Sequence, residues 1–554
     1  MWRRPLLVLG VYFVLAIFLT WPTILDPVAA IPGGERTDLW DGLWSFWFAK
    51  VRLEQGTIPM RVDGLLNHPL GGSLWVVDPL NSLVMWPLQR WVGLATAWSL
   101  LVLVHVTASG AMAWWLAWDI ADDEAAAWFG GTAYAASPLL ISHIHNGTTE
   151  AVGGAYLPAA MLAALWLFRS PGPKTALLLA PVLFITAAAH WYSGVLAFLF
   201  WGVLVLVSLA SWNEGARLVV TRCLWLAIAG AVALLFIMPM ANISVVASSA
   251  ADSVVEIKNE VALAAVRRTL GAADPVGFFH PGDYRTPDFR QLSQFAEDHI
   301  HSTYLGYVTL LGALLSLRRR AGTGLLWASV ALSLALAMGP VLVREGNPVL
   351  LRPDLPVLLP YALLEHLPGF DSLSLLFRLA QLAVLALAIL AGLGWSRLGG
   401  KATALAAAAM LSEIRLASPV AHLPGHTNGL LPSVLYTLAG APEGAVMNFP
   451  IAGGRAYLYE QAAHQKPLAG TLNFAANSSA LSLWELCLAL ADEMDPVVRA
   501  QLISGEAYRL GIRYLVAHTD PLAQPDSLGN AMQVIRASYR PALERDGVEI
   551  YRFY

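Results

Sequence analysis

Long apolar segments, repeated along the chain, constrain the fold of this sequence more than any other feature. A helix needs about 20 apolar residues to cross a hydrocarbon core about 30 Å thick. By this measure we predict about eleven spanning helices, with approximate cores at 5–21, 97–117, 125–141, 152–168, 175–189, 193–211, 223–240, 303–317, 322–340, 372–395 and 401–416. Only 13% of the residues are charged, against about 25% in average soluble domains. The sequence therefore predicts a mainly α-helical, polytopic membrane protein.

Basic residues cluster in alternate connections between the predicted spans, and such clusters mark the cytoplasmic side. They are Arg3 and Arg4, Arg169 and Lys174, Arg217 and Arg222, Arg318 to Arg320, and Arg397 and Lys401. We therefore expect a multi-pass protein of the inner (plasma) membrane with a cytoplasmic N-terminus. The segments expected outside are a long first loop at 22–96, a short polar loop at 142–151, two larger loops at 241–302 and 341–371, and the tail.

The tail, residues 417–554, is less apolar than the rest and alternates in the manner of a soluble α/β domain. We predict strands at 444–451, 512–518 and 547–553, and helices at 480–491 and 496–510. The expected organisation is a transmembrane domain at 1–416, which includes the large loop 22–96, and a small extracytoplasmic α/β domain at 417–554.

Two carboxylates follow the first predicted span, in the segment TDLWDGLWSFWF. Asp38 and Asp41 are three residues apart, so they share a face if the segment is helical. An amphipathic helix in the membrane interface would hold both near lipid headgroups, within reach of a substrate hydroxyl. The alternative is that Asp38 serves as a helix N-cap, and the two roles are compatible. A second interfacial helix is predicted at 77–88, with Asp78 near its start.

The short polar loop has the sequence SHIHNGTTE and contains His143, His145 and Glu150. Ionisable groups at a membrane face are candidates for function, and two histidines near a glutamate are a possible metal-ligand set. The alternative is that both histidines bond loop carbonyls. Candidate metal ligands are Asp38 and these three residues, and a divalent cation such as Mg²⁺ or Mn²⁺ is a candidate cofactor.

Three further residues, together with His143, His145 and Glu150, are candidates for binding an anionic, lipid-linked substrate. His190 and Tyr192 lie at the outer end of the fifth predicted span, where an aromatic-belt role is an equal alternative. Arg378 lies inside the outer part of the tenth span, where an arginine should face a cavity or an anion such as phosphate. Its alternatives are a pair with Asp371 and a snorkelling side chain.

Composition and motifs exclude several classes of function. The net charge of -4 argues against a nucleic-acid partner. The two cysteines, Cys223 and Cys487, are too far apart in sequence to suggest a disulfide framework or a metal knuckle. The chain has neither a phosphate-binding P-loop nor a dinucleotide glycine pattern.

The chain resembles the GT-C glycosyltransferases, in particular an uncharacterised bacterial group with a soluble C-terminal domain. The resemblance follows the order of several pieces over most of the chain: Asp38 with Trp44 and Trp47, HPLGGSLW, VDPLNSLVMWPL, GGTAYAASPLLISHIHNG, HSTYLGYVTLLG, AMGPVL, LPGFDSLSLLFRLAQLAVLALAILAGLG, VMNFPIAGGRAYLYEQAAHQKPLAG and IRYLVAH. Enzymes of this type move sugars from polyprenyl-phosphate donors.

The resemblance implies a hexosyl- or pentosyltransferase that moves a sugar by single displacement from a polyprenyl-phosphate-linked donor to an extracytoplasmic glycan, lipid or protein acceptor. It also implies that Asp38, with Asp41 beside it, is the catalytic or metal-coordinating carboxylate, and that Arg378 meets the donor phosphate. The related pattern has another arginine where this chain has Ser374. Two alternatives remain: a transporter or flippase for a lipid-linked substrate, and a non-catalytic scaffold.

Overall fold

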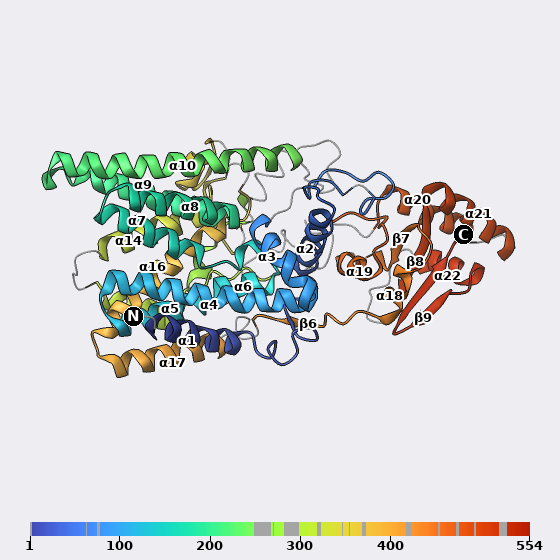
Figure 1. Cartoon of the computed structure of the whole chain (residues 1–554), viewed down its shortest axis with the longest axis horizontal. Helices are drawn as coiled ribbons and strands as arrows, with labels where there is room; N and C mark the ends of the chain where they lie inside the picture. The colour runs from blue at the N-terminus through green and yellow to red at the C-terminus, as the bar shows by residue number, and fades with distance from the viewer. Residues whose placement is uncertain are drawn as a thin grey trace.

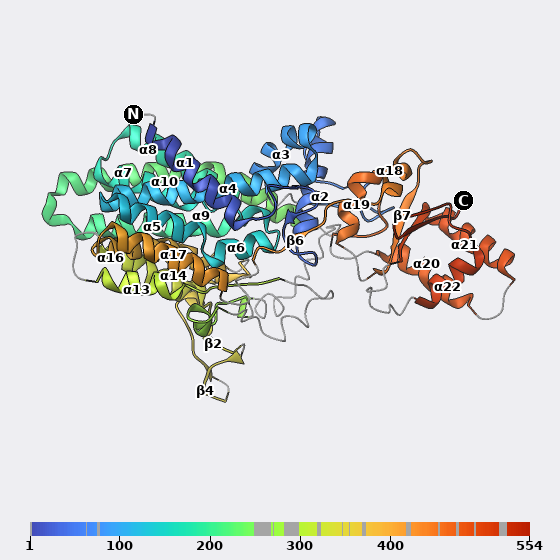
Figure 2. The same cartoon turned by 90° about the horizontal axis from the view of Figure 1, so that it is seen from below.

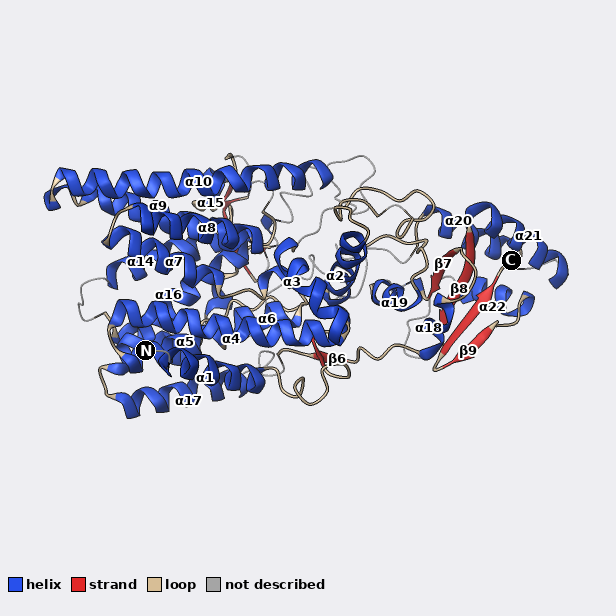
Figure 3. Cartoon of the chain, in the orientation of Figure 1, coloured by secondary structure: helices blue, strands red, loops and turns tan. Residues whose placement is uncertain are grey.

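The computed structural model describes residues 3–62, 64–74, 78–248, 268–269, 271–281, 299–317, 323–345, 347–353, 355–367, 370, 373–416, 423–451, 455–472, 476–491, 495–519 and 529–554. A bundle of helices forms one end of the molecule, and an α/β part with the C-terminus forms the other (Figure 1). The four-stranded sheet lies in that second part, whereas the bundle consists of helices (Figure 3).

Each predicted span coincides with helix in the described part of the chain. The bundle helices are α1 (Arg3–Leu19), α4 (Leu94–Ala121), α5 (Glu124–Ala135), α6 (Pro138–His145), α7 (Tyr156–Arg169), α8 (Pro173–Ala189), α9 (Trp191–Ala210), α10 (Ala216–Ser248), α13 (Tyr307–Leu315), α14 (Thr323–Ala337), α16 (Gln381–Ser396) and α17 (Gly400–Leu416). Among the described residues, four helices are long and apolar enough to cross a membrane: Leu94–Ala121, Trp191–Ala210, Ala216–Ile243 and Leu376–Ser396. The orientation in the membrane stays a prediction.

One predicted span and the loop after it differ from the structure. Helix α5 ends at Ala135, and α6 starts at Pro138, so the segment predicted as one span at 125–141 is two helices. Pro138 favours a new first turn because its fixed backbone angle suits that position. The residues predicted as a loop from 142 are helical as far as His145, and the 3-10 turn η1 (Thr149–Ala151) follows.

Burial divides the bundle into an inner and an outer layer. Helix α16 has its residues from Gln381 to Gly394 buried, which fits a helix that is apolar on every side. Helix α10 instead exposes large apolar side chains such as Leu235 and Phe236. An apolar outer surface of this kind is the surface that a helix presents to lipid.

Between α1 and α4 the chain leaves the bundle and forms α2 (Leu39–Glu54) and α3 (Pro79–Val92). Both helices were expected in this loop as interfacial helices. Asp78 caps α3, because its carboxylate accepts the backbone N–H of Asn81 at 3.1 Å.

The tail has the predicted α/β composition. Its sheet has the order β7-β8-β10-β9, with β7 parallel to β8 and the other neighbours antiparallel. The strands are β7 (Ala445–Phe449), β8 (Ile512–His518), β9 (Leu543–Arg545) and β10 (Val548–Arg552), and the helices are α18 (Ser433–Ala439), α19 (Ala456–His464), α20 (Ser478–Ala489), α21 (Pro496–Leu510) and α22 (Gly529–Ser538). The strands and helices predicted in the tail agree with these bounds to within two residues.

The tail packs on the first loop. The strand β1 (Ile31–Pro32) pairs with β6 (His426–Thr427), and one buried apolar cluster combines side chains of α2 with others of α18 and β7. Trp44 of α2 also donates its indole N–H to Oε1 of Gln461 at 2.7 Å. The domain boundary at 416/417 stays a prediction, since 417–422 lie outside the described residues. The packing nevertheless brings α19 against α2, and this contact forms the site described next.

Two small hairpins follow α14. Strands β2 (Val343–Arg344) and β3 (Asn347–Pro348) form the first, and β4 (Leu350–Arg352) and β5 (Leu355–Pro356) form the second. The chain then returns to the bundle through α15 (Tyr361–Leu364) and the 3-10 turn η4 (Leu376–Ala380). The remaining 3-10 turns are η2 (Trp212–Glu214) and η3 (Pro275–Phe278).

Candidate functional site

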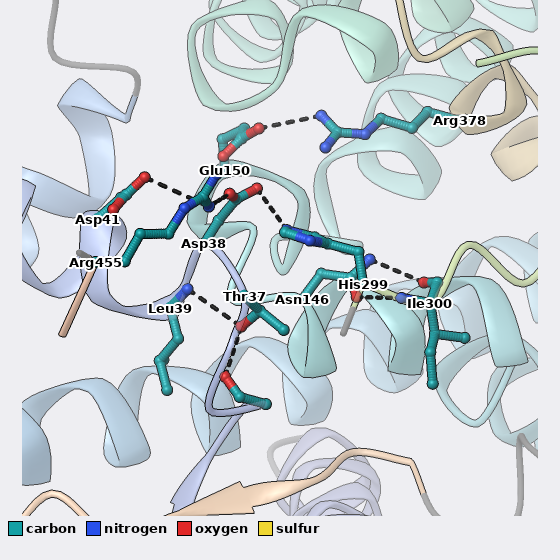
Figure 4. A network of polar contacts seen from close by, with 11 residues as sticks. Thr37, Asp38, Leu39, Asp41, Asn146, Glu150, His299, Ile300, Arg378 and Arg455 are labelled. Atoms are coloured by element: carbon teal, nitrogen blue, oxygen red, sulfur yellow. Dashed lines mark hydrogen bonds and ion pairs between the residues drawn. The ribbon is translucent and has the colours of Figure 1, made fainter. Parts of the chain in front are cut away.

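Asp38 occupies the N-cap position of α2, but its side chain makes no capping hydrogen bond. The hydroxyl of Thr37 accepts the backbone N–H of Leu39 instead, at 3.4 Å, and donates to the carbonyl of Gly34 at 2.7 Å. The predicted capping role of Asp38 is therefore wrong for its side chain. Its carboxylate belongs to a polar network (Figure 4).

Two cationic or potentially cationic groups contact this carboxylate from distant parts of the chain. Arg455, at the start of α19, donates to Oδ1 of Asp38. The ring Nε2 of His299 lies 3.1 Å from Oδ2 of the same carboxylate. Nη1 of Arg455 also lies 3.5 Å from Oδ2 of Asp41. The tail thus supplies a positive charge to the predicted pair of carboxylates.

The network keeps Asp38 ionised. Burial acts to raise the pKa of Asp38, but the charges and hydrogen bonds of His299 and Arg455 outweigh it and hold that pKa well below its usual range. The side chain of Asp38 is nevertheless 41% exposed. An ionised carboxylate that a substrate can reach is able to accept a hydrogen bond from a hydroxyl group.

Arg378 lies next to this network and pairs with Glu150. Its Nη1 is 3.1 Å from Oε1 of Glu150, and both side chains are largely buried. Figure 4 shows this pair beside Asp38 and Arg455. The guanidinium also lies over the ring of Tyr192, at 5.4 Å from its centroid. The alternative partner Asp371 lies outside the described residues.

Tyr192 and His190 surround the segment that carries Arg378. The hydroxyl of Tyr192 accepts the backbone N–H of Leu375 at 2.8 Å. The ring of His190 shares a hydrogen bond of 2.9 Å with the hydroxyl of Ser193, which itself donates to Gln381. Tyr192 therefore contacts the segment of Arg378 directly, and His190 reaches the first residue of α16 through Ser193.

The two histidines of SHIHNGTTE point in different directions. His143 is buried and packs near His190 and Phe377, with ring centroids 6.3 Å and 6.1 Å away. His145 accepts the backbone N–H of Gly425 through Nδ1 at 3.0 Å, so it faces the chain leading to the tail. At Nδ1 of His145 the predicted bond to a loop carbonyl is wrong, because this atom accepts a backbone N–H.

The candidate metal ligands do not converge. Within the ranges that the structure describes, no group of three His, Cys, Asp or Glu side chains is arranged to hold a metal ion. Asp38 pairs with Arg455, Glu150 pairs with Arg378, and His145 binds a backbone amide. In this arrangement these residues do not fit a divalent cation, because the charged partners of Asp38 and Glu150 occupy the place of a metal ion.

A fourth carboxylate, that of Asp78, is buried and interacts with the charge of Glu150. Asp78 accepts a hydrogen bond from Nδ2 of Asn81 at 2.7 Å, and Oδ1 of Asn81 lies 2.9 Å from Nε2 of His105. Burial raises the pKa of Asp78 to about 7, and the nearby charge of Glu150 adds to this effect against the hydrogen bonds of Asn81. The site thus contains one carboxyl group with a lowered pKa, Asp38, and one with a raised pKa, Asp78.

Arg455 and His299 carry no signal in the sequence that marks them as site residues. Arg455 was visible only as part of AGGR after a predicted strand, 417 positions from Asp38. His299 belongs to the run EDHIH on the side predicted to lie outside. Neither pattern distinguishes a site residue from an ordinary surface residue, because the contact depends on how the tail packs against α2.

Comparison with known proteins places the fold. No protein-family model and no curated protein matches the sequence. Among solved structures, the arabinofuranosyltransferase AftD from Mycobacteria is similar with a TM-score of 0.55 and 14% identity, over 100% of this chain and 42% of AftD. The chain thus spans less than half of the length of AftD.

Two structures of an archaeal oligosaccharyltransferase from Archaeoglobus fulgidus are also similar, each with a TM-score of 0.46 and 12% identity. One is AglB in complex with an inhibitory peptide and a dolichol-phosphate, aligned over 94% of this chain and 70% of that one. The other is the apo form, aligned over 93% and 69%. The similarity to AftD shows the fold of this chain, and it agrees with the fold that the resemblance in sequence implies.

Proposed function

We propose that this GT-C-fold protein is a membrane glycosyltransferase that moves a sugar from a polyprenyl-phosphate-linked donor to an extracytoplasmic acceptor. AftD, which shares the fold, is by name an arabinofuranosyltransferase, and glycosyl transfer is the reaction that we carry over from it. The observation that carries the proposal is the ionised, partly exposed carboxylate of Asp38, which lies beside two arginines. This combination provides both a partner for a hydroxyl and positive charge for a phosphate.

In the proposed reaction, Asp38 accepts a hydrogen bond from the acceptor hydroxyl and orients its oxygen toward the anomeric carbon. The new bond forms between that oxygen and carbon as the bond from the carbon to the lipid phosphate breaks. The hydroxyl proton passes to Asp38. A carboxylate with a lowered pKa is a weak base, so we expect Asp38 to gain basicity when Arg455 turns from it to the substrate.

The leaving group is a lipid phosphate, whose charge must be offset as the bond breaks. Arg455 and Arg378 are suited to this role, since a guanidinium matches phosphate oxygens in a bidentate manner. Arg378 is held in the structure by Glu150 at 3.1 Å. When Arg455 turns from Asp38 to the substrate, we propose that its ion pair with Asp41 keeps it near the site.

The direct test measures sugar transfer by the full chain in proteoliposomes containing a panel of polyprenyl-phosphate-linked sugars. Asp38→Asn should abolish transfer without loss of membrane insertion. Asp26→Asn is a matched control in the same loop, because Asp26 caps its own turn at the backbone N–H groups of Val28 and Ala29. Normal transfer by Asp38→Asn would refute the assigned role. Movement of the intact lipid-linked sugar between leaflets, without transfer, would instead favour a flippase.

A further inference from the structure

The two hairpins between α14 and α15 form a projection that the proposed chemistry does not use. We call residues 340–359 the finger. It extends from the side of the bundle across the direction of the helix axes, near the end of the bundle that carries the site (Figure 2). Backbone hydrogen bonds close its base, from Leu359 to Pro340 and from Leu342 to Val357, each at 2.9 Å.

The base of the finger is fixed to the bundle. Asp274 accepts the backbone N–H of Val276 at 2.9 Å and that of Glu345 at 2.5 Å, so one carboxylate joins η3 to the first hairpin. The side chain of Val343 is buried in the same region. The finger is therefore held in one direction relative to the helices by contacts of its own.

The tip of the finger is apolar and uncovered. Leu350, Leu351, Leu355 and Leu358 are exposed, Leu351 by 68%. Leu350 and Leu351 belong to β4, whose pairing with β5 is irregular between Leu350 and Arg352, and both side chains stay exposed there. A two-stranded hairpin without a core is marginal in water, and this one has leucines where a water-facing hairpin would have polar side chains.

The lipid bilayer is the partner that these features fit. The bundle likewise exposes large apolar side chains, among them Leu311 and Leu314 of α13. A projection that leaves a spanning bundle across its helix axes runs along the membrane surface. By sequence the finger carries two basic and two acidic residues, Arg344, Arg352, Glu345 and Asp354. Its attraction to lipid should therefore be apolar rather than electrostatic.

We propose that the finger inserts its leucines into the boundary between headgroups and acyl chains of the leaflet at the site end of the bundle. This inference rests on the membrane placement in the proposed function, but not on the chemistry. The chain runs from the finger through Tyr361, whose hydroxyl binds the carbonyl of Phe370, to the turn that carries Arg378. Insertion would therefore fix the depth of that arginine relative to the phosphates of the leaflet.

The test places a fluorescent label on the finger of the full chain in phosphatidylcholine nanodiscs. Leu351→Cys, in a Cys223→Ser background, is labelled with an environment-sensitive fluorophore, and Cys487 is buried and so protected from the label. Leu502→Cys is the matched control, an exposed leucine on α21 of the tail. Gel filtration checks that each labelled protein is intact.

The label at 351 should lose about half of its emission or more with spin-labelled lipid, as an inserted apolar group would, and little with iodide. The label at 502 should be quenched strongly by iodide and little by spin-labelled lipid. Adding anionic phosphatidylglycerol should change neither result. Iodide quenching at 351 equal to that at 502 would overturn the proposal, and so would protection from both quenchers, which would indicate a protein partner. None of these readouts depends on sugar transfer, so their failure is distinct from failure of the proposed enzyme activity.

Discussion

Replacing Arg455 with glutamine tests whether the tail completes the site. The substitution removes the positive charge that contacts Asp38 and lies 3.5 Å from Asp41, and it leaves a polar side chain in place. If Arg455 offsets charge on the leaving phosphate, its loss must destabilise the transition state more than it destabilises the resting protein.

The expected size of the effect follows from the distance and the exposure. At 3.5 Å, two unit charges interact by about 1 kcal/mol in water and about 5 kcal/mol at an effective dielectric constant of about 20. The side chains of Arg455 and Asp41 are 15% and 22% exposed, so solvent reaches this pair, and the lower part of the range, about 1–2 kcal/mol, applies. That loss corresponds to a decrease in kcat/KM of about 5- to 30-fold.

The assay compares kcat/KM for sugar transfer among the wild type, Arg455→Gln and Arg455→Lys, and the lysine variant should recover part of the loss. Arg455 also favours the ionised form of Asp38, so Arg455→Gln should raise the pKa of Asp38. Activity that needs ionised Asp38 should then fail at a higher pH on acidification than in the wild type. Arg509→Gln is the control, because Arg509 pairs with Glu506 on the exposed face of α21. An unchanged kcat/KM in Arg455→Gln, at an unchanged melting temperature, would refute a role of the tail in the chemistry.

Three other predictions concern the same region. Glu150→Gln leaves Arg378 buried without its charged partner, which should cost about 3 kcal/mol of stability in denaturant unfolding; a loss below about 0.5 kcal/mol, the range of ordinary surface changes, would contradict a tight buried pair. The pKa of Asp78 is raised to about 7 in the folded protein from an ordinary value of 3.8, so its contribution to stability is complete below the unfolded value and is lost as the pH rises toward 7. Asp78→Asn should remove that part of the pH dependence in thermal unfolding. An identical pH profile in the wild type and the variant would show that folding does not raise the pKa of Asp78. The pKa of Asp38 is lowered, so its stabilising contribution should persist from neutral pH to about 4 and vanish only on further acidification; in Asp38→Asn the stability difference from the wild type should shrink below that pH.

The helices could be predicted because a membrane-spanning segment can be recognised from its length and its apolar composition alone. The tail strands at 445–449 and 512–518 were equally accessible, since each is a short apolar run between turn residues. The break between α5 and α6 was missed because the surrounding residues stay apolar across it. Pro138 was the one local signal, and proline also occurs within continuous membrane helices.

Only some residues of the candidate site could be predicted from the sequence. Asp38, Asp41, Glu150 and Arg378 lie in segments whose polar residues are unusual for their surroundings. Their partners Arg455 and His299 are ordinary residues for theirs. The pairing of Arg455 with Asp38 depends on α19 packing against α2, where the rings of Trp40 and Tyr459 also contact each other, tilted by 31° with centroids 5.1 Å apart. A long-range contact of this kind has no periodic signature.

The short pairing of β1 with β6 has a consequence for how the molecule can be divided. Ile31 and Pro32 belong to the loop after the first helix, and their partners His426 and Thr427 lie just before the tail. Cutting the gene between the bundle and the tail would thus separate β1 from its partner strand β6. It would also expose the tryptophan-rich side of α2 to solvent. Neither fragment is expected to be a self-sufficient folding unit, and attempts to express the tail alone should yield protein that is less cooperative in unfolding than the intact chain.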